Sequence, residues 1–236
     1  YMKRLDGLLF LAGAGSDSRF DDMHLAQRLA IPLRVVPNSV SPYAAAILPQ
    51  PSQSLQARDR LMAVGSYHWL KGFDFVVRAY AASQARHRFS LHLYGQEYSA
   101  FTGVLRSLVR RLGLRKESVV FHEGVSGEAL VAAYRQARLV LSGSHTECQP
   151  LVLLDANAAG TPFVARKTGC IETMPGGVAV RTSEEMALQM DLLANGGLSW
   201  QSLADAGRQA AQDIHHPDHT ARQLIDALAD MGGLPL

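Results

Sequence analysis

The stretch LVLSGSHTECQPLVLLDANAAGTPFVARK (residues 139–167) contains the strand–helix–strand pattern that decides the fold. Residues 139–144 and 162–167 are short and apolar, which is typical of buried strands. Between them, residues 150–160 predict a helix, because this segment opens with a proline and closes with a glycine. Two apolar strands joined by a helix predict a βαβ unit with parallel strands.

The same alternation extends over most of the chain. Further apolar strands are predicted at 5–12, 33–40, 61–66, 89–95, 118–124 and 177–182, and helices at 20–30, 73–83, 101–114, 126–137, 183–196, 199–214 and 217–232. Ser126, followed by Glu128, predicts a capped start for one of these helices. The fold class is therefore α/β, a Rossmann-like parallel sheet with helices on both faces, and ligands should bind beyond the carboxyl ends of its strands.

Composition excludes several classes of protein. The net charge of +2 over 236 residues is too small to indicate a nucleic-acid partner. No apolar run approaches the ~20 residues of a membrane helix. Cys148 and Cys170 lack zinc-ligand spacing, and so few cysteines favour a reducing, cytoplasmic location.

The first segment with a chemical signal is GSYHWLKGF, residues 65–73, between a strand and a helix. Lys71 precedes a glycine and the start of the helix, where free backbone amides and the helix dipole favour an anion. The alternative is a solvent-exposed lysine in a loop. Trp69, in the same loop, allows two interpretations, stacking on a sugar or base, or an exposed aromatic without a ligand.

The second segment is the loop and helix of residues 143–162. Glu147 follows a strand, and the amides of residues 149–152 are expected to point out of the helix start. Asp155 lies among apolar residues inside the helix, where a carboxylate needs a partner or a ligand. The alternative is an acid at a helix start and a second acid, at the edge of the core, with an ordinary protein partner.

These segments resemble the C-terminal donor-binding domain of retaining GT-B glycosyltransferases of the family 4, or group 1, type. GSYHWLKG resembles the family's G-R-L-x-x-x-K-G turn, and ECQPLVLLDANAAGTPFV resembles its E-G-F-G-L-V-x-L-E-A-M-A-x-G-x-P-V-V motif. VVPNSV, VVFHEGV and TGCIETM resemble three further motifs, in the family's order, so the likeness covers about residues 33–230. Five ordered motifs are more specific than any one of them.

The resemblance implies roles for the matching residues. Two are assigned to catalysis: Lys71 would bind the donor diphosphate, and Glu147 would lie beside the donor sugar and phosphates. The implied donor-binding residues are Gly65, Ser66, Gly95, Gly124, Val125, Gln149, Pro150, Leu151 and Asp155. Among them, Asp155 would bind the ribose, and the residues at 95, 124 and 125 would lie near the base.

The sequence departs from the family pattern at three places. Ser66 replaces the phosphate-binding arginine, Asp155 replaces a glutamate, and Cys148-Gln149-Pro150 replaces the G-F-G loop. Loss of the arginine removes a bidentate phosphate clamp. Either another basic residue substitutes, with Arg166, Lys167 and His145 as candidates that are equally consistent with surface groups, or the affinity for the donor is lower.

The resemblance implies a glycosyltransferase of polysaccharide biosynthesis that moves a sugar from a nucleoside diphosphate to a carbohydrate or lipid-linked acceptor with retention. No Asp-x-Asp occurs, so no metal and no cofactor is expected. The rival interpretation is a catalytically silent nucleotide-sugar-binding module, and a third is an unrelated doubly wound domain with another phosphate ligand. A basic helix and turn (Arg106, Arg110, Arg111, Arg115 and Lys116) is either a solvated face or a peripheral contact with anionic lipid.

The expected domain organisation has two parts. Residues 1–32 would be the tail end of a mostly missing N-terminal acceptor domain, and residues 33–236 the donor-binding domain with the C-terminal helices. The chain begins with Tyr1 and is expected to be a fragment that binds donor with little transfer by itself.

Overall fold

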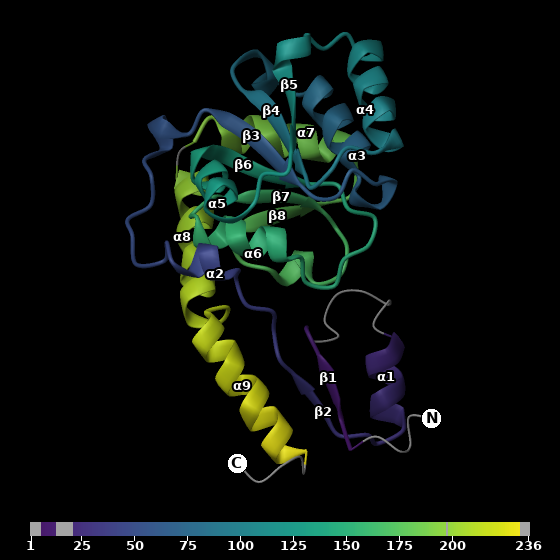
Figure 1. Ribbon diagram of the computed structural model, residues 1–236, viewed down its shortest axis with the longest axis vertical. Coiled ribbons are helices and arrows are strands. Elements are labelled where there is room, and N and C mark those ends of the chain that lie inside the picture. The colour runs from purple at the N-terminus through teal and green to yellow at the C-terminus, as the bar shows by residue number, and fades with distance from the viewer. Residues whose placement is uncertain (1–5, 13–20, 197, 232–236) are drawn as a thin grey trace.

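The computed structural model describes residues 6–12, 21–196 and 198–231, and its main body is a six-stranded parallel sheet (Figure 1). The order across the sheet is β5-β4-β3-β6-β7-β8. Its strands are β3 (Arg60–Val64), β4 (Ser90–Gly95), β5 (Val119–Glu123), β6 (Ala137–Ser142), β7 (Phe163–Arg166) and β8 (Gly177–Val180). All six lie where the alternation of the sequence predicts them, and all pair in parallel.

The chain changes direction across the sheet at its centre. From β3 it runs outward through β4 to β5, then returns to β6 beside β3 and continues to β7 and β8. The helices that follow the two central strands, α3 (Phe73–Ala82) and α6 (Leu151–Ala158), therefore leave in opposite directions. Such a switch point is where open parallel sheets bind ligands.

Helices cover both faces of the sheet, as predicted. One core contains side chains of α3, α4 (Ala100–Arg111) and α7 (Ser183–Ala194), and the other contains those of α5 (Gly127–Gln136) and α6. In β6, Leu139 and Leu141 belong to the first core and Val140 to the second. A strand buried on both faces reads as a continuous apolar run, which explains its sequence.

Local signals explain most helix starts, with one exception. Ser99 and Thr102 form a capping box at the start of α4. Ser126 is the N-cap residue of α5, but its side chain makes no capping hydrogen bond, so that detail of the prediction is wrong. Short 3₁₀ turns and one short helix complete the loops: α2 (Pro42–Ala45), Leu55–Ala57, Trp69–Lys71, Gln84–His87, Lys116–Ser118 and Ile171–Thr173.

Two C-terminal helices extend from the sheet. The first, α8 (Leu198–Asp213), places Trp200 in the first core and Ala211 in the second, so it passes the edge of the sheet. The last, α9 (Pro217–Asp230), runs down from the main body toward the N-terminal elements in Figure 1. No helix in the described part of the chain has the length and apolar character needed to cross a membrane.

The N-terminal elements form a small separate layer. Strands β1 (Leu8–Phe10) and β2 (Leu33–Val35) pair in parallel, with α1 (Asp21–Arg28) between them in the chain. Arg34 forms an ion pair of 3.2 Å with Asp230 at the end of α9. Residues 1–5 and 13–20 of the predicted acceptor-domain segment lie outside the described residues, and the assignment of 1–32 to a separate domain stays a prediction.

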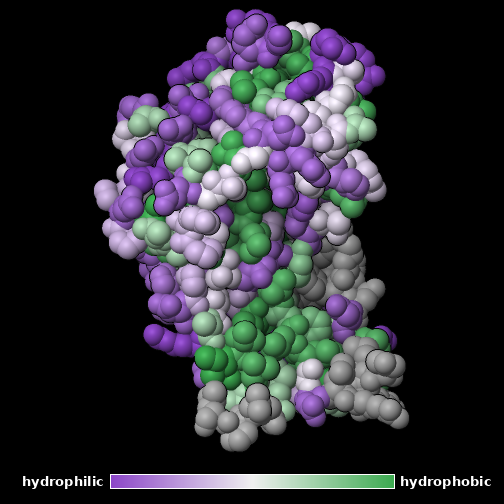
Figure 2. All heavy atoms as spheres, viewed as in Figure 1, coloured by the Kyte–Doolittle hydropathy of each residue, from purple (hydrophilic) through white to green (hydrophobic). Residues whose placement is uncertain are grey.

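Apolar side chains gather on the surface around this layer, at the lower end of Figure 2. They come from β1 and the residue after it, from β2 and from α9, and include Leu9, Leu11, Val35, Leu224, Ile225 and Leu228, which are between 39% and 47% exposed. A parallel pair of strands is marginally stable by itself. The layer therefore depends on α9 and on whatever else covers its apolar surface.

Candidate functional site

The candidate site lies where the loops after β3 and β6 meet. Gly72 adopts the left-handed conformation with φ of +61°, and a Cβ atom on it would overlap the carbonyl oxygen of Gly143. The amide of His145 donates a hydrogen bond of 2.8 Å to the carbonyl of Leu70. Glycine is therefore required at this junction, because only backbone without side chains allows the two loops to touch.

Lys71 and Glu147 form an ion pair across this junction. The Nζ of Lys71 lies 2.8 Å from Oε1 of Glu147, with the side chains 37% and 15% exposed. The stem of the lysine passes Gly65, where a Cβ atom would lie 3.2 Å from its Cγ. The structure thus brings together the two residues assigned to catalysis and places the end of β3 against them.

The loop after Glu147 is held from two sides. The backbone amide of Asn38 donates to Oε1 of Gln149 (2.6 Å), and the side-chain amide of Asn38 donates to the carbonyl of Gln149 (3.0 Å). Gly169, with φ of +55°, packs directly against the carbonyl oxygens of Glu147 and Cys148. Neither contact was anticipated for the site, although VVPNSV and TGCIETM, which contain these residues, were recognised as motifs.

The start of α6 faces the same junction. Pro150 is its N-cap residue with extended backbone, and Leu151, the first helical residue, is 54% exposed. Because the first amides of a helix have no partner within it, this end can donate hydrogen bonds to an anion. The 2.8 Å ion pair places the ammonium of Lys71 at the carboxylate of Glu147, four residues before Leu151 in the chain.

Asp155, one turn further along α6, has a partner within the protein. Its Oδ1 accepts a hydrogen bond of 2.7 Å from the amide of Ser41, the N-cap residue of α2. Burial raises the pKa of this carboxyl above its usual value, and the hydrogen bond to Ser41 opposes that effect. Burial and the nearby Asp155 raise the pKa of the Tyr134 hydroxyl well above its usual value. The structure therefore gives Asp155 an ordinary protein partner, Ser41, as the alternative interpretation has it.

A groove of about 490 Å³ opens beside the ion pair, at the carboxyl ends of β3, β4 and β5. Five of the implied donor-binding residues line it: Gly65, Ser66, Gly95, Gly124 and Val125. Its other walls include Tyr94, Gln96, Ser126 and Leu130. Gly95 is required there, because a Cβ atom would overlap the ring of Tyr67. Gln149, Pro150, Leu151 and Asp155 do not line the groove and belong to the loop and helix after β6.

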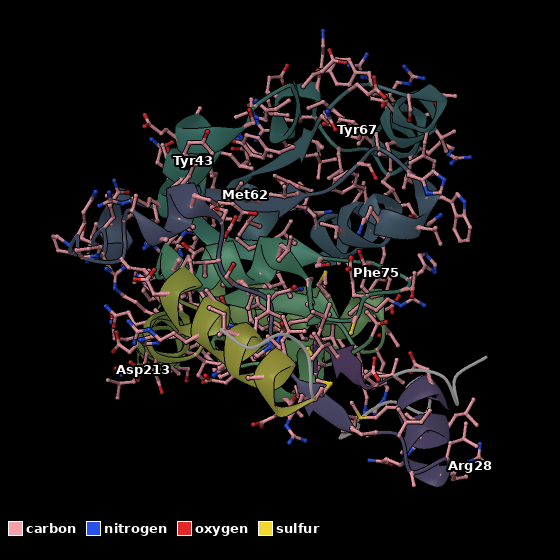
Figure 3. The ribbon with its side chains drawn as sticks, turned by 60° about the horizontal axis from the view of Figure 1, so that its bottom comes forward. Arg28, Tyr43, Met62, Tyr67, Phe75 and Asp213 are labelled. Atoms are coloured by element: carbon pink, nitrogen blue, oxygen red, sulfur yellow. The ribbon has the colours of Figure 1, made fainter. Side chains whose placement is uncertain are left out.

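The three candidates for the missing arginine have different surroundings. Nη1 of Arg166 lies 3.1 Å from Nδ1 of His145, and its guanidinium lies over the ring of Phe75. Lys167 instead forms an ion pair of 2.5 Å with Glu172. Tyr67 belongs to the first core, against which Phe75 packs, and Met62 of β3 belongs to the second; Figure 3 shows Tyr67 and Phe75 to one side of Met62 and Tyr43 to the other. Arg166 and His145 thus share the side of the sheet on which α3 packs.

Comparison with known families gives a match over the main body of the structure. The profile described as "Glycosyl transferases group 1" matches residues 58–195. The chain is 34% identical over 169 residues to a D-inositol 3-phosphate glycosyltransferase of Acidothermus cellulolyticus, covering 64% of this chain and 36% of that protein. It is 33% identical over 109 residues to an uncharacterized glycosyltransferase of Methanocaldococcus jannaschii, covering 46% of this chain and 27% of that protein. The chain therefore spans about a third of the length of these relatives.

Solved structures of GT-B type share the fold. The sucrose-phosphate synthase of Thermosynechococcus elongatus superposes with a TM-score of 0.75 at 20% identity, covering 98% of this chain and 59% of that one. The Anabaena protein HepE in complex with UDP superposes with a TM-score of 0.77 at 18% identity, covering 97% of this chain and 65% of that one. At these identities the likeness establishes the α/β architecture of the sheet and its helices.

Proposed function

Because the chain belongs to the group 1 glycosyl transferases, we propose that it binds a nucleoside-diphosphate sugar and serves its transfer to an acceptor. The observation that carries the proposal is the ion pair of Lys71 and Glu147 at the switch point between β3 and β6. The groove next to it leaves room for a nucleoside. HepE was solved with UDP and with UDP-glucose, which supports UDP as the first nucleotide to test.

The proposed roles follow the order of the strands. The base lies in the groove at the ends of β3 to β5, and the carboxylate of Asp155, which also bonds to Ser41, binds the ribose. The diphosphate lies between Lys71 and the amides at the start of α6. Glu147, which holds the lysine, then lies beside the sugar.

Lys71 and the amides at the start of α6 would assist the reaction electrostatically. When the bond between the sugar and the phosphate breaks, negative charge grows on the departing diphosphate. A fixed ammonium and fixed amides stabilise that charge without having to reorganise. The proposal is that they act in place of a metal ion and that the sugar is transferred with retention of its anomeric configuration.

The ion pair sets opposite expectations for its two members. Lys71→Ala removes charge-assisted hydrogen bonds and should weaken the binding of UDP about 10- to 100-fold. Glu147→Gln releases the lysine from its carboxylate, so UDP should bind as well or better while transfer by the full-length protein falls. An ion pair that only joins the two loops would give neither effect, because UDP would then not contact either side chain.

Isothermal titration calorimetry with UDP and UMP tests the proposal. UDP should bind more tightly than UMP, and Lys71→Ala should abolish most of that difference. Lys116→Ala, which removes an exposed lysine of the turn before β5, is the matched control and should bind UDP like the unchanged chain. Equal affinities of the unchanged chain and Lys71→Ala for UDP would contradict the proposal.

A second candidate function is a nucleotide-sugar-binding module without catalysis. It is favoured by two observations: Ser66 provides no cation in the groove, and Asp155 is already bonded to Ser41. Release of UDP from a UDP-sugar by the full-length protein separates the two candidates, since a silent module binds the donor and leaves it intact.

The acceptor is proposed to be a carbohydrate or a lipid-linked carbohydrate. Several relatives are named for transfer to D-inositol 3-phosphate. The exposed arginines of α4 and the turn before β5 provide charge for a peripheral contact with anionic lipid. Sedimentation with vesicles that contain or lack anionic lipid tests that contact separately from nucleotide binding.

A further inference from the structure

Trp69, Phe75, His145 and Arg166 form a cluster at the carboxyl ends of β3, β6 and β7, which we call the Arg166 cluster. Nη1 of Arg166 lies 3.1 Å from Nδ1 of His145, and its Cζ lies 5.2 Å from the ring centre of Phe75. The ring of Trp69 meets that of His145 edge-on, with 5.6 Å between their centres. Two rings thus hold the guanidinium in place, and the ring of Trp69 lies against one of them, that of His145.

Among the residues that the structure describes, no neighbouring acid neutralises the charge of Arg166. Lys71 lies 2.8 Å from Glu147, and Lys167 lies 2.5 Å from Glu172. Within the described residues, no carboxylate lies within 4.0 Å of the Arg166 guanidinium. The side chain is half-buried, so its charge is partly removed from water and favours an anionic ligand.

Trp69 adds an apolar surface to this cation. Its side chain is 55% exposed, whereas Trp200, the other tryptophan of the chain, is 3% exposed. An indole presents a large flat apolar face and serves where one side of a ligand is apolar and the other is wet. A sugar ring has an apolar face of C–H groups, and a phosphate or carboxylate on it supplies the anion that Arg166 lacks.

The position of the cluster separates it from the nucleoside groove. That groove lies at the ends of β3, β4 and β5, whereas Arg166 ends β7, two strands beyond β3 on the other side of the ion pair. Adjacent strands are about 4.8 Å apart, so β7 lies about 10 Å from β3. A donor with its base in the groove and its diphosphate at Lys71 would reach the cluster only with its sugar end.

We infer that the Arg166 cluster binds an anionic sugar, phosphorylated or carboxylated, on the acceptor side of the reaction. Arg166, held by His145 and Phe75, binds the anion, and Trp69 packs against the sugar ring. The inference rests on the proposed function for the identity of the neighbouring donor site. It assigns Arg166 to a ligand other than the donor diphosphate.

Quenching of tryptophan fluorescence by acrylamide tests the inference on this chain. Acrylamide is neutral and reaches Trp69 far more readily than the buried Trp200. Glucose 6-phosphate should protect the fluorescence from quenching, and glucose and inorganic phosphate should protect less at equal concentration. Trp69→Phe should remove the protection signal and confirm its origin.

Four titrations distinguish the two sites. Arg166→Gln should raise the Kd for glucose 6-phosphate roughly 10- to 100-fold and leave the Kd for UDP unchanged. Lys71→Ala should do the reverse. Arg78→Gln, which removes an exposed arginine of α3, is the matched control for both ligands. Should Arg166→Gln fail to fold, Arg166→Lys, which keeps the charge but loses the planar fork, should weaken glucose 6-phosphate by a smaller factor.

The outcomes also separate this inference from the proposed function. Absence of protection by glucose 6-phosphate in a chain that binds UDP overturns the inference alone. A loss of UDP affinity in Arg166→Gln also overturns it, because Arg166 would then belong to the donor site. Binding of glucose 6-phosphate without binding of UDP supports the cluster and contradicts the proposed donor site.

Discussion

Gly72 and Gly143 pack backbone against backbone, and neither has room for a Cβ atom. One precedes α3 and the other follows β6, so their contact joins the two loops that carry Lys71 and Glu147. The ion pair at the candidate site therefore depends on two residues that have no side chain and cannot contact a ligand through one.

Gly143→Ala should destabilise the protein and displace the ion pair. Its Cβ would overlap the carbonyl oxygen of Gly72 and lie 3.1 Å from the Cβ of Phe75, so the loops must separate. Overpacking of this kind costs about 1–3 kcal/mol, which lowers the Tm of a chain of this size by roughly 2–4 °C for each kcal/mol. Thermal unfolding and UDP titration should both be affected.

Gly103→Ala is the matched control, with the opposite sign expected. Gly103 lies on the exposed side of α4, and a Cβ atom there meets nothing within 4 Å. Alanine is favoured over glycine inside a helix by roughly 0.5–1 kcal/mol. A higher Tm with unchanged UDP affinity is expected, and a Tm for Gly143→Ala equal to that of the unchanged chain would rule out the tight contact.

Ser66→Arg should strengthen the binding of nucleoside diphosphates. Ser66 is exposed and lines the groove next to Gly65, so a longer side chain has space. A guanidinium there should add charge-assisted hydrogen bonds to phosphate and lower the Kd for UDP about 10-fold or more. Calorimetry with uridine is the control: a matching gain for uridine, which has no phosphate, would show that the arginine acts on the nucleoside.

Asp155→Ala should affect both stability and nucleotide binding. The amide of Ser41 loses its 2.7 Å partner, which should cost about 1 kcal/mol or more in the free energy of unfolding. Asp155→Asn keeps an acceptor oxygen and should cost less. If the carboxylate also binds the ribose, Asp155→Ala should weaken UDP more than 2′-deoxy-UDP; equal losses for both would leave Asp155 with a structural role only.

His92 should make the fold sensitive to mild acid. Its ring nitrogens lie 3.0 Å from Ser90 Oγ and 2.9 Å from His122 Nε2. Burial, helped by the charge of Arg60 and by His122 and opposed by Asp59, lowers the pKa of His92 from 6.5 to about 4. The unfolded chain then binds this proton at a higher pH than the folded one, so the free energy of unfolding is full above about pH 6.5 and falls as the pH drops toward about 4.

Urea unfolding of His92→Asn, at pH values inside and above that window, measures this contribution. The variant should lose less stability between the two pH values than the unchanged chain. His87→Asn, which replaces an exposed histidine, is the matched control. A fall in stability that is as steep in His92→Asn as in the unchanged chain would show that other groups cause it.

The parts of the fold that could be predicted from the sequence are those with a local signal. Buried strands such as β6 read as apolar runs, and α6 opens after a proline and ends before a glycine. The alternation of strands and helices also predicts that Lys71 and Glu147 each follow a strand, and the observed strand order makes those two strands neighbours. Their direct ion pair follows from the loop conformations, which local patterns do not determine.

The contacts that could not be predicted join residues far apart in the chain. Asn38 and Gln149 are 111 positions apart, and Ser41 and Asp155 are 114 apart. Both pairs depend on how the segment around residues 38–41, before β3, packs against α6 and the loop that precedes it. The spacing of apolar residues along the sequence does not determine that packing. Ser126 shows that a local signal can also mislead: its residue type is typical of a helix N-cap, but its side chain makes no capping hydrogen bond.

Lys71 and Glu147 are separated by 76 positions, and the segment between them contains the strands β4, β5 and β6. A shortened chain ending before β6 could keep the nucleoside groove but would have no anion site. Under the proposed function, the affinity for a diphosphate beyond that for the nucleoside would report complete assembly, because the proposed anion site forms only when β6 has paired with β3.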